Sequence, residues 1–440
     1  MKNHIKLTMI FLILIFIGCG KDDDSNIEDV VEISLGDLNN SIRENSPTAT
    51  LLGTFSAIVE NTEETATYTL LSQSPEGAVR LNGNALVIAN NALYDFETIT
   101  EVTGQIQASV DDVTTIANFT ISLTNVEEFV VSSLKNSQDE RVFFRTPSGM
   151  VQDQQGNIFV VEIFNHSISK ISTDGSITSL AGNGNSGFSD GRGVAASFNF
   201  PNGLAIDNDG NLYVADEGNH RIRKVTPDGD VTTFAGTGEE GFKDGEGNIA
   251  LFSSPNSIVW SAKHEAFFVT EIGNNTIRSV SLEGKVNLVA GKPGEENEDY
   301  KDGVGEIARF NSPNGICVNE LGDLFVADTG NDAIRSITFD NEGATVSTFA
   351  GSTVNNAAFD SPKGVAIDGN GTLYIADTDN HLIKRVENRE VTTIAGDGTE
   401  GIEDGIGLEA TFRRPQNLMI TNTGLIYTNS FNNMRIIEIQ

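Results

Sequence analysis

The chain has 440 residues, of which 62 are acidic and 28 basic, so its formal net charge is −34 at pH 7. This acidic balance argues against binding of nucleic acid and against adsorption to anionic lipid headgroups, because both depend on clustered Lys and Arg. Only two cysteines occur, Cys19 and Cys317, which excludes a framework of disulfides. The length predicts about three structural units.

The first segment has the pattern of a targeting signal. Two lysines precede an apolar run over residues 7–17, which is too short to span a bilayer as a helix, and Gly18 and Cys19 follow. This arrangement resembles the signal peptide of bacterial lipoproteins, in which the cysteine after the cleavage site is acylated. We therefore expect residues 1–18 to be removed and Cys19 to carry the lipid. An ordinary secretory signal with an incidental cysteine is the alternative.

An acidic tether is predicted over residues 19–27, where Lys21 is followed by three aspartates. This run resembles the export tag that sends some lipoproteins of gram-negative bacteria to the outside of the outer membrane. The resemblance implies a cell-surface protein that contacts the membrane through its lipid anchor only. A solvated tether without an addressing role is the other interpretation, since charge runs are commonly just that.

Residues 28–127 are predicted to form a β-sandwich. Short runs rich in Thr, Val, Ile and Leu alternate with turn residues at a spacing typical of that fold. The expected strands lie at residues 66–71, 85–88, 104–109 and 119–123.

Three motifs in this region resemble the landmarks of a cadherin repeat, namely Glu44-Asn45-Ser46-Pro47, Tyr94-Asp95-Phe96-Glu97 and Asn125-Val126-Glu127-Glu128. In that family, oxygen ligands at these positions bind Ca²⁺ at the junction with the next module. The resemblance implies Ca²⁺ as the one possible cofactor, with Glu44, Asp95 and Glu97 as candidate ligands and Asn125 and Glu127 as weaker ones. The Ala-x-Asp element of that family is replaced here by Ala108-Ser109-Val110, with Asp111 and Asp112 displaced, and no second cadherin-like module follows. A sandwich without calcium is therefore the alternative.

The remaining chain, residues 129–440, is an internal repeat. Its copies are marked by prolines at intervals of 54, 54, 58, 49 and 53 residues, namely Pro147, Pro201, Pro255, Pro313, Pro362 and Pro415. Each complete copy contains four runs of strand length separated by Asp-Gly or Gly-Asn turns. A period near 50 residues with four strands per copy is typical of the blades of a β-propeller.

The motifs within the copies resemble the NHL repeat. The clearest copy reads Pro201-Asn202-Gly203-Leu204-Ala205-Ile206-Asp207, then Leu212-Tyr213-Val214-Ala215-Asp216, then Arg221-Ile222-Arg223-Lys224. The resemblance implies a six-bladed NHL-type propeller over residues 129–440. The fold class expected for the whole chain is therefore all-β, with a cadherin-like β-sandwich followed by this propeller.

The two ends of the repeat region are predicted to meet in one sheet. The sixth copy stops at its third strand, over residues 436–440, while a strand-like segment at 131–134 precedes the first copy. We expect this early segment to pair with the C-terminal strand and to close the propeller, because such pairing removes exposed strand edges.

Four of the loops between copies share an Asp-Gly dipeptide, and three of these carry an aromatic residue two positions before the Asp. Local turn bonding explains an Asp before a Gly without any ligand. The aromatic rings are expected either to stack on sugar rings or to pack against the neighbouring blade. The residues are Asp190, Asp244, Asp302 and Asp404, with Phe188, Phe242 and Tyr300.

The residue after each marker proline begins an innermost strand and is expected to surround the mouth of the central channel. These residues are Ser148, Asn202, Asn256, Asn314, Lys363 and Gln416. Amides and one ammonium group can donate and accept hydrogen bonds, which suits a polar ligand. The last five are therefore the candidate ligand-binding residues. Simple capping of strand ends in solvent is the alternative.

Signals of catalysis are weak. Some NHL propellers are lyases that use a metal held by histidines, but here His166, His220 and His381 occupy equivalent positions on different blades and cannot converge on one ion. We expect them to pack between blades, and we assign no catalytic residue. The function expected is binding or adhesion to an extracellular protein or glycan. The alternatives are a lyase or hydrolase acting on a sugar or peptide at the channel mouth, and a structural spacer.

Overall fold

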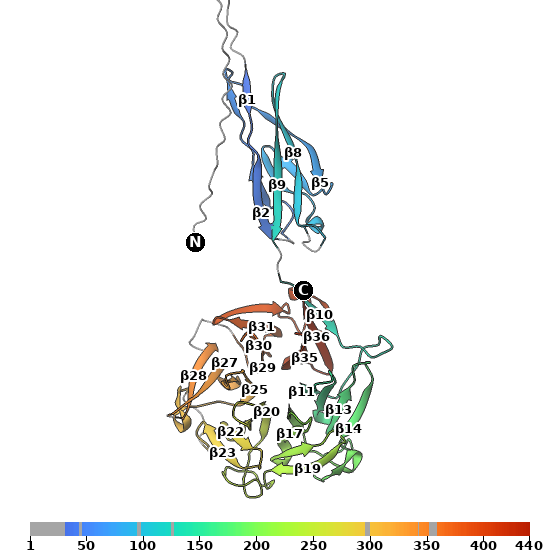
Figure 1. The fold of residues 1–440 in the computed structure, drawn as a ribbon, viewed down its shortest axis with the longest axis vertical. Coiled ribbons are helices and arrows are strands. Elements are labelled where there is room, and N and C mark those ends of the chain that lie inside the picture. The colour runs from blue at the N-terminus through green and yellow to red at the C-terminus, as the bar shows by residue number, and fades with distance from the viewer. Residues whose placement is uncertain are drawn as a thin grey trace, which may run out of the picture. The chain divides into compact units, whose positions relative to one another are not determined.

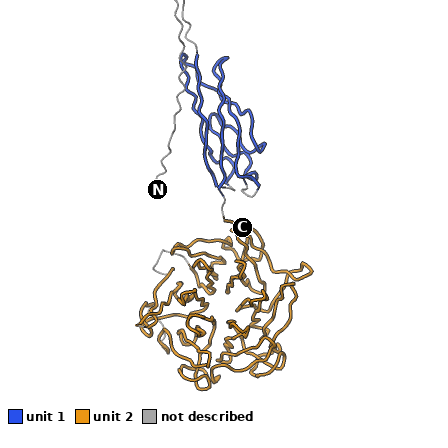
Figure 2. The backbone as a smooth tube through the Cα atoms, in the orientation of Figure 1, with its two compact units in different colours: residues 1–126 blue, residues 127–440 orange. Residues whose placement is uncertain are grey.

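The computed structural model describes residues 31–43, 46–94, 98–124, 127–294, 300–341, 343–351 and 359–440. The chain divides into two compact units, residues 1–126 and 127–440 (Figure 2). Within the described ranges the elements are strands and short 3-10 turns, without any α-helix. Accordingly, the described part contains no helix long and apolar enough to cross a membrane. The predicted all-β class is confirmed.

In its described residues the first unit contains two larger sheets around one hydrophobic core and a two-stranded sheet of β1 and β4. A four-stranded sheet has the order β2-β9-β8-β5, with β2 parallel to β9, and a three-stranded sheet has the order β3-β7-β6. Buried side chains of both sheets, such as Ile88 from the smaller and Phe119 from the larger, share the core. The strands are β1 (Glu32–Ser34), β2 (Leu38–Arg43), β3 (Leu51–Thr54), β4 (Ile58–Glu60), β5 (Thr67–Ser74), β6 (Val79–Asn82), β7 (Ala85–Ile88), β8 (Glu101–Val110) and β9 (Val113–Thr124).

All four strands predicted for this unit are present, as β5, β7, β8 and β9. The resemblance to a cadherin repeat stays a prediction. Four candidate calcium ligands, Glu44, Asp95, Glu97 and Asn125, lie outside the described residues, and so does the expected lipidation site, Cys19.

The second unit consists of six antiparallel sheets arranged radially (Figure 1). The strands of each blade are given from the innermost outward. The first blade has β11 (Pro147–Gln152), β12 (Ile158–Glu162), β13 (Ser167–Ile171) and β14 (Ile177–Ala181). The second has β16 (Pro201–Ile206), β17 (Leu212–Asp216), β18 (Arg221–Val225), β19 (Asp230–Ala235) and β15 (Gly191–Arg192), and the third has β20 (Pro255–Ser261), β21 (Ala266–Glu271), β22 (Thr276–Ser281) and β23 (Val286–Ala290).

The fourth to sixth blades follow the same plan. The fourth blade has β25 (Pro313–Val318), β26 (Leu324–Asp328), β27 (Ala333–Asp340), β28 (Gly343–Gly351) and β24 (Gly303–Val304). The fifth has β29 (Pro362–Ile367), β30 (Leu373–Asp377), β31 (Leu382–Glu387) and β32 (Glu390–Ala395). The sixth has β34 (Pro415–Ile420), β35 (Ile426–Ser430), β36 (Asn433–Ile439), β10 (Phe129–Ser133) and β33 (Gly405–Ile406).

The blades pack through their faces. Each innermost strand contacts the innermost strand of the next blade, and β34 of the sixth blade contacts β11 of the first. Buried clusters span neighbouring sheets, as where Tyr213 of the second blade meets Phe267 of the third with ring centroids 4.0 Å apart. Because both faces of a blade are covered, four of the second strands, β12, β17, β26 and β30, are continuous apolar runs that end in an acidic residue, and they are wholly buried.

The segment before the first blade belongs to the sixth sheet. Strand β10 pairs antiparallel with the C-terminal strand β36, from Phe129 opposite Ile439 to Ser133 opposite Arg435. Asp404, in the loop before the sixth blade, accepts hydrogen bonds from Ser133 at 2.9 Å and from Arg435 at 2.8 Å. Both ends of the second unit therefore meet in one sheet, with the partner strand that the sequence predicts.

Candidate binding site

Six hydrogen bonds connect neighbouring blades on the face where the innermost strands begin. In each, a residue after the turn between the second and third strands accepts the backbone N–H of the residue before the next marker proline. His166 Nδ1 accepts from Phe200 at 3.1 Å. The other acceptors are His220, Asn275, Asp332, His381 and Asn432, at 3.1, 2.7, 2.8, 3.1 and 3.2 Å from the backbone nitrogens of Ser254, Ser312, Ser361, Arg414 and Thr146.

These bonds give the three histidines a structural role. Burial lowers the pKa of His166, against the raising effect of Asp216, so the imidazole is neutral and Nδ1 is free to accept. On the other three blades an Asn or Asp side chain accepts the equivalent backbone N–H, so the position requires a hydrogen-bond acceptor rather than a metal ligand. In the described ranges, no group of three or more His, Cys, Asp or Glu side chains is placed to hold a metal ion.

A buried arginine organises the loop before the second blade. The Arg223 guanidinium is fully buried, and it pairs with Asp216 at 2.9 Å and with Asp190 at 2.6 Å. The rings of Phe188 and Phe198 lie 4.8 and 5.3 Å from it. Charge and aromatic contacts of this kind hold the loop on its own blade.

The same cluster recurs on the next two blades and in part on the sixth. Arg278 pairs with Glu271 and Asp244, and Arg335 pairs with Asp328 and Asp302, all at 2.5–2.9 Å. Arg435 keeps only the loop carboxylate, Asp404, because Ser430 replaces the strand carboxylate. We call these four assemblies the arginine clusters; their central residues are Arg223, Arg278, Arg335 and Arg435.

The arginine clusters correct the prediction for the loop aspartates. Turn formation alone does not account for Asp190, Asp244, Asp302 and Asp404, because each binds a buried arginine on the third strand of the blade that follows it. The loop aromatics Phe188, Phe242 and Tyr300 lie over the same guanidinium groups, at 4.8, 4.4 and 4.5 Å. Of the two alternatives for these rings, packing on the blade is the one that the contacts support.

The channel mouth contains a chain of polar contacts around one carboxylate. Glu217 Oε2 accepts from Asn202 at 3.0 Å and from Asn256 at 3.4 Å. Ser148 donates a short hydrogen bond to Asn202 and accepts one from Asn417 at 2.9 Å. Residues of the sixth, first, second and third blades are thereby linked.

Glu217 is a mouth residue that the sequence reasoning missed. It lies in the turn Glu217–Asn219 after β17, and the equivalent turns begin with Ile163, Ile272, Thr329, Thr378 and Phe431. The signal was present, because Glu217 is the one acidic residue at this position of the repeat.

Three mouth residues on adjacent blades carry polar groups without partners. In the part of the chain that the structure describes, no hydrogen bond or ion pair is formed by the ammonium of Lys363 or by the side-chain amides of Asn314 and Gln416. Burial lowers the pKa of Lys363, and Arg414 adds to this effect, while Asp379 and Glu217 oppose it. We call Asn314, Lys363 and Gln416 the open arc of the mouth.

Exposed aromatic side chains lie on the same face, because they occupy the turns and strand starts that open toward it. Phe164 and Phe200 are 58% and 41% exposed, and their rings meet edge to face at 5.8 Å. Phe431, 49% exposed, lies 4.2 Å under the guanidinium of Arg413. Sequence reasoning did not single out these three rings, although polar or aliphatic residues stand at most of the equivalent positions.

The remaining predicted metal ligand is engaged elsewhere. The carboxylate of Glu127 accepts a short hydrogen bond from Arg385 on β31, within the second unit. The assignment of Glu127 as a weaker calcium ligand stays a prediction.

Comparison with protein families finds the NHL repeat. The model described as "NHL repeat" matches residues 198–225, 310–335 and 359–385, which belong to the second, fourth and fifth blades. These are the copies in which the predicted motif is most complete. The chain therefore carries NHL repeats.

Curated relatives match the chain over part of their length. The chain is 31% identical to "NHL repeat-containing protein 2" of Gallus gallus over 215 residues, which cover 43% of the chain and 29% of that protein. It is 26% identical to "Protein SUPPRESSOR OF QUENCHING 1, chloroplastic" of Arabidopsis thaliana over 283 residues, or 59% of the chain and 27% of that protein. The chain thus spans less than a third of either relative.

A solved structure resembles most of the chain. It is a structural genomics protein of unknown function from Bacteroides thetaiotaomicron, with a TM-score of 0.53 and 15% sequence identity, covering 95% of this chain and 99% of that one. At this identity the likeness concerns the fold alone. It agrees with the NHL matches and with the six radial sheets in assigning an NHL-type propeller fold.

Proposed function

We propose that this protein is a lipid-anchored binding or adhesion protein of the cell surface, and that the mouth face of its propeller binds an extracellular glycan or protein. The observation that carries the proposal is the open arc. Asn314, Lys363 and Gln416 present unpartnered donors and acceptors side by side, on a face where the other polar groups are largely bonded to each other.

Lys363 is half-buried. Partial burial of an unpaired ammonium is unfavourable, and a ligand acceptor placed against Lys363 reduces that cost. The flanking amides of Asn314 and Gln416 add directional hydrogen bonds. Phe164 and Phe200 supply an exposed apolar contact of the kind that marks interaction surfaces. The net charge of −34 disfavours polyanionic ligands, so a neutral glycan or a protein surface suits the face best.

A screen of glycan and extracellular-protein arrays with the soluble chain from residue 27 onward tests this proposal. We expect a specific ligand whose binding is lost in Lys363→Gln and kept in Lys285→Gln. The second variant makes the same change of charge on an exposed turn residue outside the mouth. Absence of any ligand, or equal binding by both variants, contradicts the proposal.

A lyase or hydrolase acting at the mouth is the second candidate, and the lowered pKa of Lys363 is the observation that favours it. A lysine whose pKa is lowered by burial loses its proton more readily than a free lysine, which favours a role as general base. Incubation of each array ligand with the protein, followed by mass spectrometry of the products, separates the two functions. If the wild-type protein converts a ligand and the Lys363→Met variant does not, the enzymatic function is supported in place of the binding function.

Location at the outer membrane rests on the Cys19 motif. We expect the wild-type protein in the membrane fraction of its host, accessible to external protease. The Cys19→Ala variant is expected to lose its lipid and leave that fraction. A Cys19→Ala variant that still fractionates with the membrane excludes this anchor.

Calcium binding is proposed at the predicted ligands Glu44, Asp95 and Glu97, with Asn125 and Glu127 as weaker ones. We expect heat on titration with millimolar Ca²⁺, and we expect the Asp95→Asn variant to release none. A flat titration of the wild-type chain discards the calcium site and leaves a structural sandwich.

A further inference from the structure

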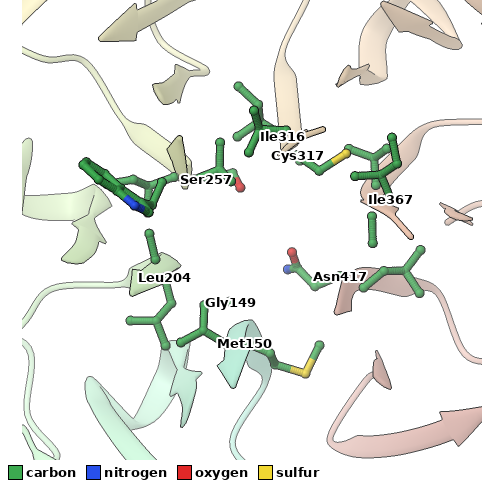
Figure 3. Close-up of a pocket in the computed structure, with 18 of the residues that line it drawn as sticks. Gly149, Met150, Leu204, Ser257, Ile316, Cys317, Ile367 and Asn417 are labelled. Atoms are coloured by element: carbon green, nitrogen blue, oxygen red, sulfur yellow. The ribbon is translucent and has the colours of Figure 1, made fainter. Parts of the chain in front are cut away.

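A cavity of about 290 Å³ lies on the axis of the propeller, lined by the innermost strands of all six blades (Figure 3). Its volume is about twice the ~150 Å³ of a cavity that accepts benzene. Most lining residues are aliphatic, with Leu204, Ile316 and Ile367 among them, and the described lining includes no charged side chain. The surface that they expose to the cavity is apolar and polar in about equal parts. A concave space of this size in which a small number of side chains offer polar groups is a common form of small-molecule site.

The polar groups of this cavity occur where the repeat departs from its motif. Two residues after the marker proline, four blades have a glycine, at positions 149, 203, 315 and 364. A Cβ atom on any of these glycines would collide with the backbone of the next blade. The third and sixth blades instead carry Ser257 and Asn417, and their polar groups point into the cavity from opposite sides (Figure 3).

A second residue that differs from the repeat motif forms a hydrogen bond to each of these residues. At the position on the second strand where three blades have alanine, the third blade has Thr270 and the sixth has Asn429. Thr270 Oγ1 accepts the backbone N–H of Ser257 at 2.9 Å, and Asn429 Oδ1 accepts that of Asn417 at 2.7 Å. Both also donate to a backbone carbonyl of the next blade, at 2.7 and 2.6 Å. The two cavity-facing residues are thus held in place by groups that the other blades lack.

These two residues retain hydrogen-bonding capacity. Among the described residues, the hydroxyl of Ser257 and the side-chain oxygen of Asn417 have no partner. The amide nitrogen of Asn417 donates to Ser148 at 2.9 Å, which orients its oxygen. The cavity therefore offers one hydroxyl and one amide oxygen on opposite walls.

We infer that the axial cavity binds a small uncharged molecule that has an apolar body and a hydrogen-bonding group at each of two opposite ends. The aliphatic walls contact the body, while Ser257 and Asn417 bind the two ends. A charged ligand is excluded, because its desolvation has no counter-charge in the lining to offset it. This site is distinct from the open arc, and the inference does not depend on the proposed glycan or protein ligand.

Two unique residues report on this cavity. Trp260, the one tryptophan in the sequence, and Cys317 both line it. Burial raises the pKa of the Cys317 thiol well above its usual range, so its alkylation is slow. An occupant is expected to shift the emission of Trp260 and to slow the alkylation of Cys317 further.

The test compares three probes in the intact protein by Trp260 emission, namely trans-1,4-cyclohexanedimethanol, cyclohexanemethanol and cyclohexanecarboxylate. The diol is expected to bind about fivefold more tightly than the mono-alcohol, as one additional neutral hydrogen bond predicts. The carboxylate is expected not to bind. The diol is also expected to protect Cys317 from an apolar alkylating reagent.

Variants separate the hydrogen bonds from the apolar walls. Ser257→Gly installs the residue of four other blades, and it is expected to abolish the advantage of the diol while the mono-alcohol still binds. Lys285→Gln, at an exposed turn residue outside the cavity, is expected to change neither affinity. Equal binding of diol and mono-alcohol, an undiminished preference in Ser257→Gly, or no protection of Cys317 in the wild type overturns the inference. The protection experiment needs no variant, so it decides the case even where Ser257→Gly fails to fold.

Discussion

The arginine clusters and the open arc are two sets of polar residues made by the same repeat, and they differ in how completely they are bonded. The guanidinium nitrogens Nη1 and Nη2 of Arg278 bind two carboxylates and two backbone carbonyls, and the side chain is fully buried. Lys363 and its neighbours in the open arc have no such partners among the described residues. The difference indicates that the first set holds the blade together while the second is available to a ligand.

Residues that differ between the copies of the repeat lie at the mouth and the axial cavity, while residues that recur hold the blades together. The arginine clusters use positions that recur on the second, third and fourth blades and in part on the sixth, as expected for groups that hold a blade together. Glu217, Ser257 and Asn417 each differ from the residue at that position in most other blades, and they line the mouth or the axial cavity. In a repeat protein, comparison of the copies with one another can therefore separate structural from functional residues.

The largest effect is expected from removal of the strand that joins the two ends of the second unit. Deletion of residues 129–133 exposes the edge of β36 and removes the buried side chains of Phe129 and Val131, each worth about 1.5–3 kcal/mol. We expect loss of the cooperative thermal transition. An unchanged transition would show that this strand does not hold the propeller together.

The next largest effect tests the arginine clusters. Arg278→Met leaves Glu271 buried without its counter-charge, and breaking a buried pair in this way costs about 3–5 kcal/mol. We expect urea denaturation to show this loss. The double variant Arg278→Met with Glu271→Leu should recover more than half of it, because no buried unpaired charge remains and Asp244, which also loses its partner, is exposed to solvent. Equal stability of the two variants would contradict the role of the pair.

A smaller effect concerns the histidines between the blades. The pKa of His166 is lowered by burial, so the unfolded chain takes up the proton first as the pH falls below about 6.5. Stability is therefore full above that pH and is lost as the pH falls toward the lower pKa of the folded state. We expect a lower urea midpoint at pH 5.5 than at pH 7.5.

The matched control for this pH effect is His166→Asn. Asn275 and Asn432 accept the same inter-blade bond on other blades and do not titrate over this range. We expect His166→Asn to lose less stability than the wild type between pH 7.5 and 5.5. Identical losses would mean that carboxylates, and not this imidazole, account for the pH dependence.

Much of the fold could be predicted from the sequence, because short-range sequence patterns determine where the strands begin and how they are grouped into blades. The marker prolines set where each innermost strand begins, and the incomplete sixth copy identified β10 as the partner of β36. The arginine clusters could not be predicted in this way. Asp190 and Arg223 are 33 residues apart, and nothing in the spacing shows that a loop returns to the third strand of the next blade.

The candidate site was predictable in part. The mouth residues follow from the start of each strand, but their bonding does not, so the sequence alone did not distinguish Asn202, which binds Glu217, from Lys363, which has no partner among the described residues. Glu217 and Ser257 were visible as departures between copies. Their meaning depended on knowing which positions face the mouth and the axis.

The most direct test of the central comparison measures stability and binding in the same variant. For the ligand found by the array screen, Lys363→Gln is expected to weaken binding about tenfold or more, as the loss of a charged hydrogen bond predicts. Its free energy of unfolding should stay within about 0.5 kcal/mol of the wild type. A large loss of stability with unchanged affinity would instead place Lys363 among the groups that hold the propeller together and would contradict the account.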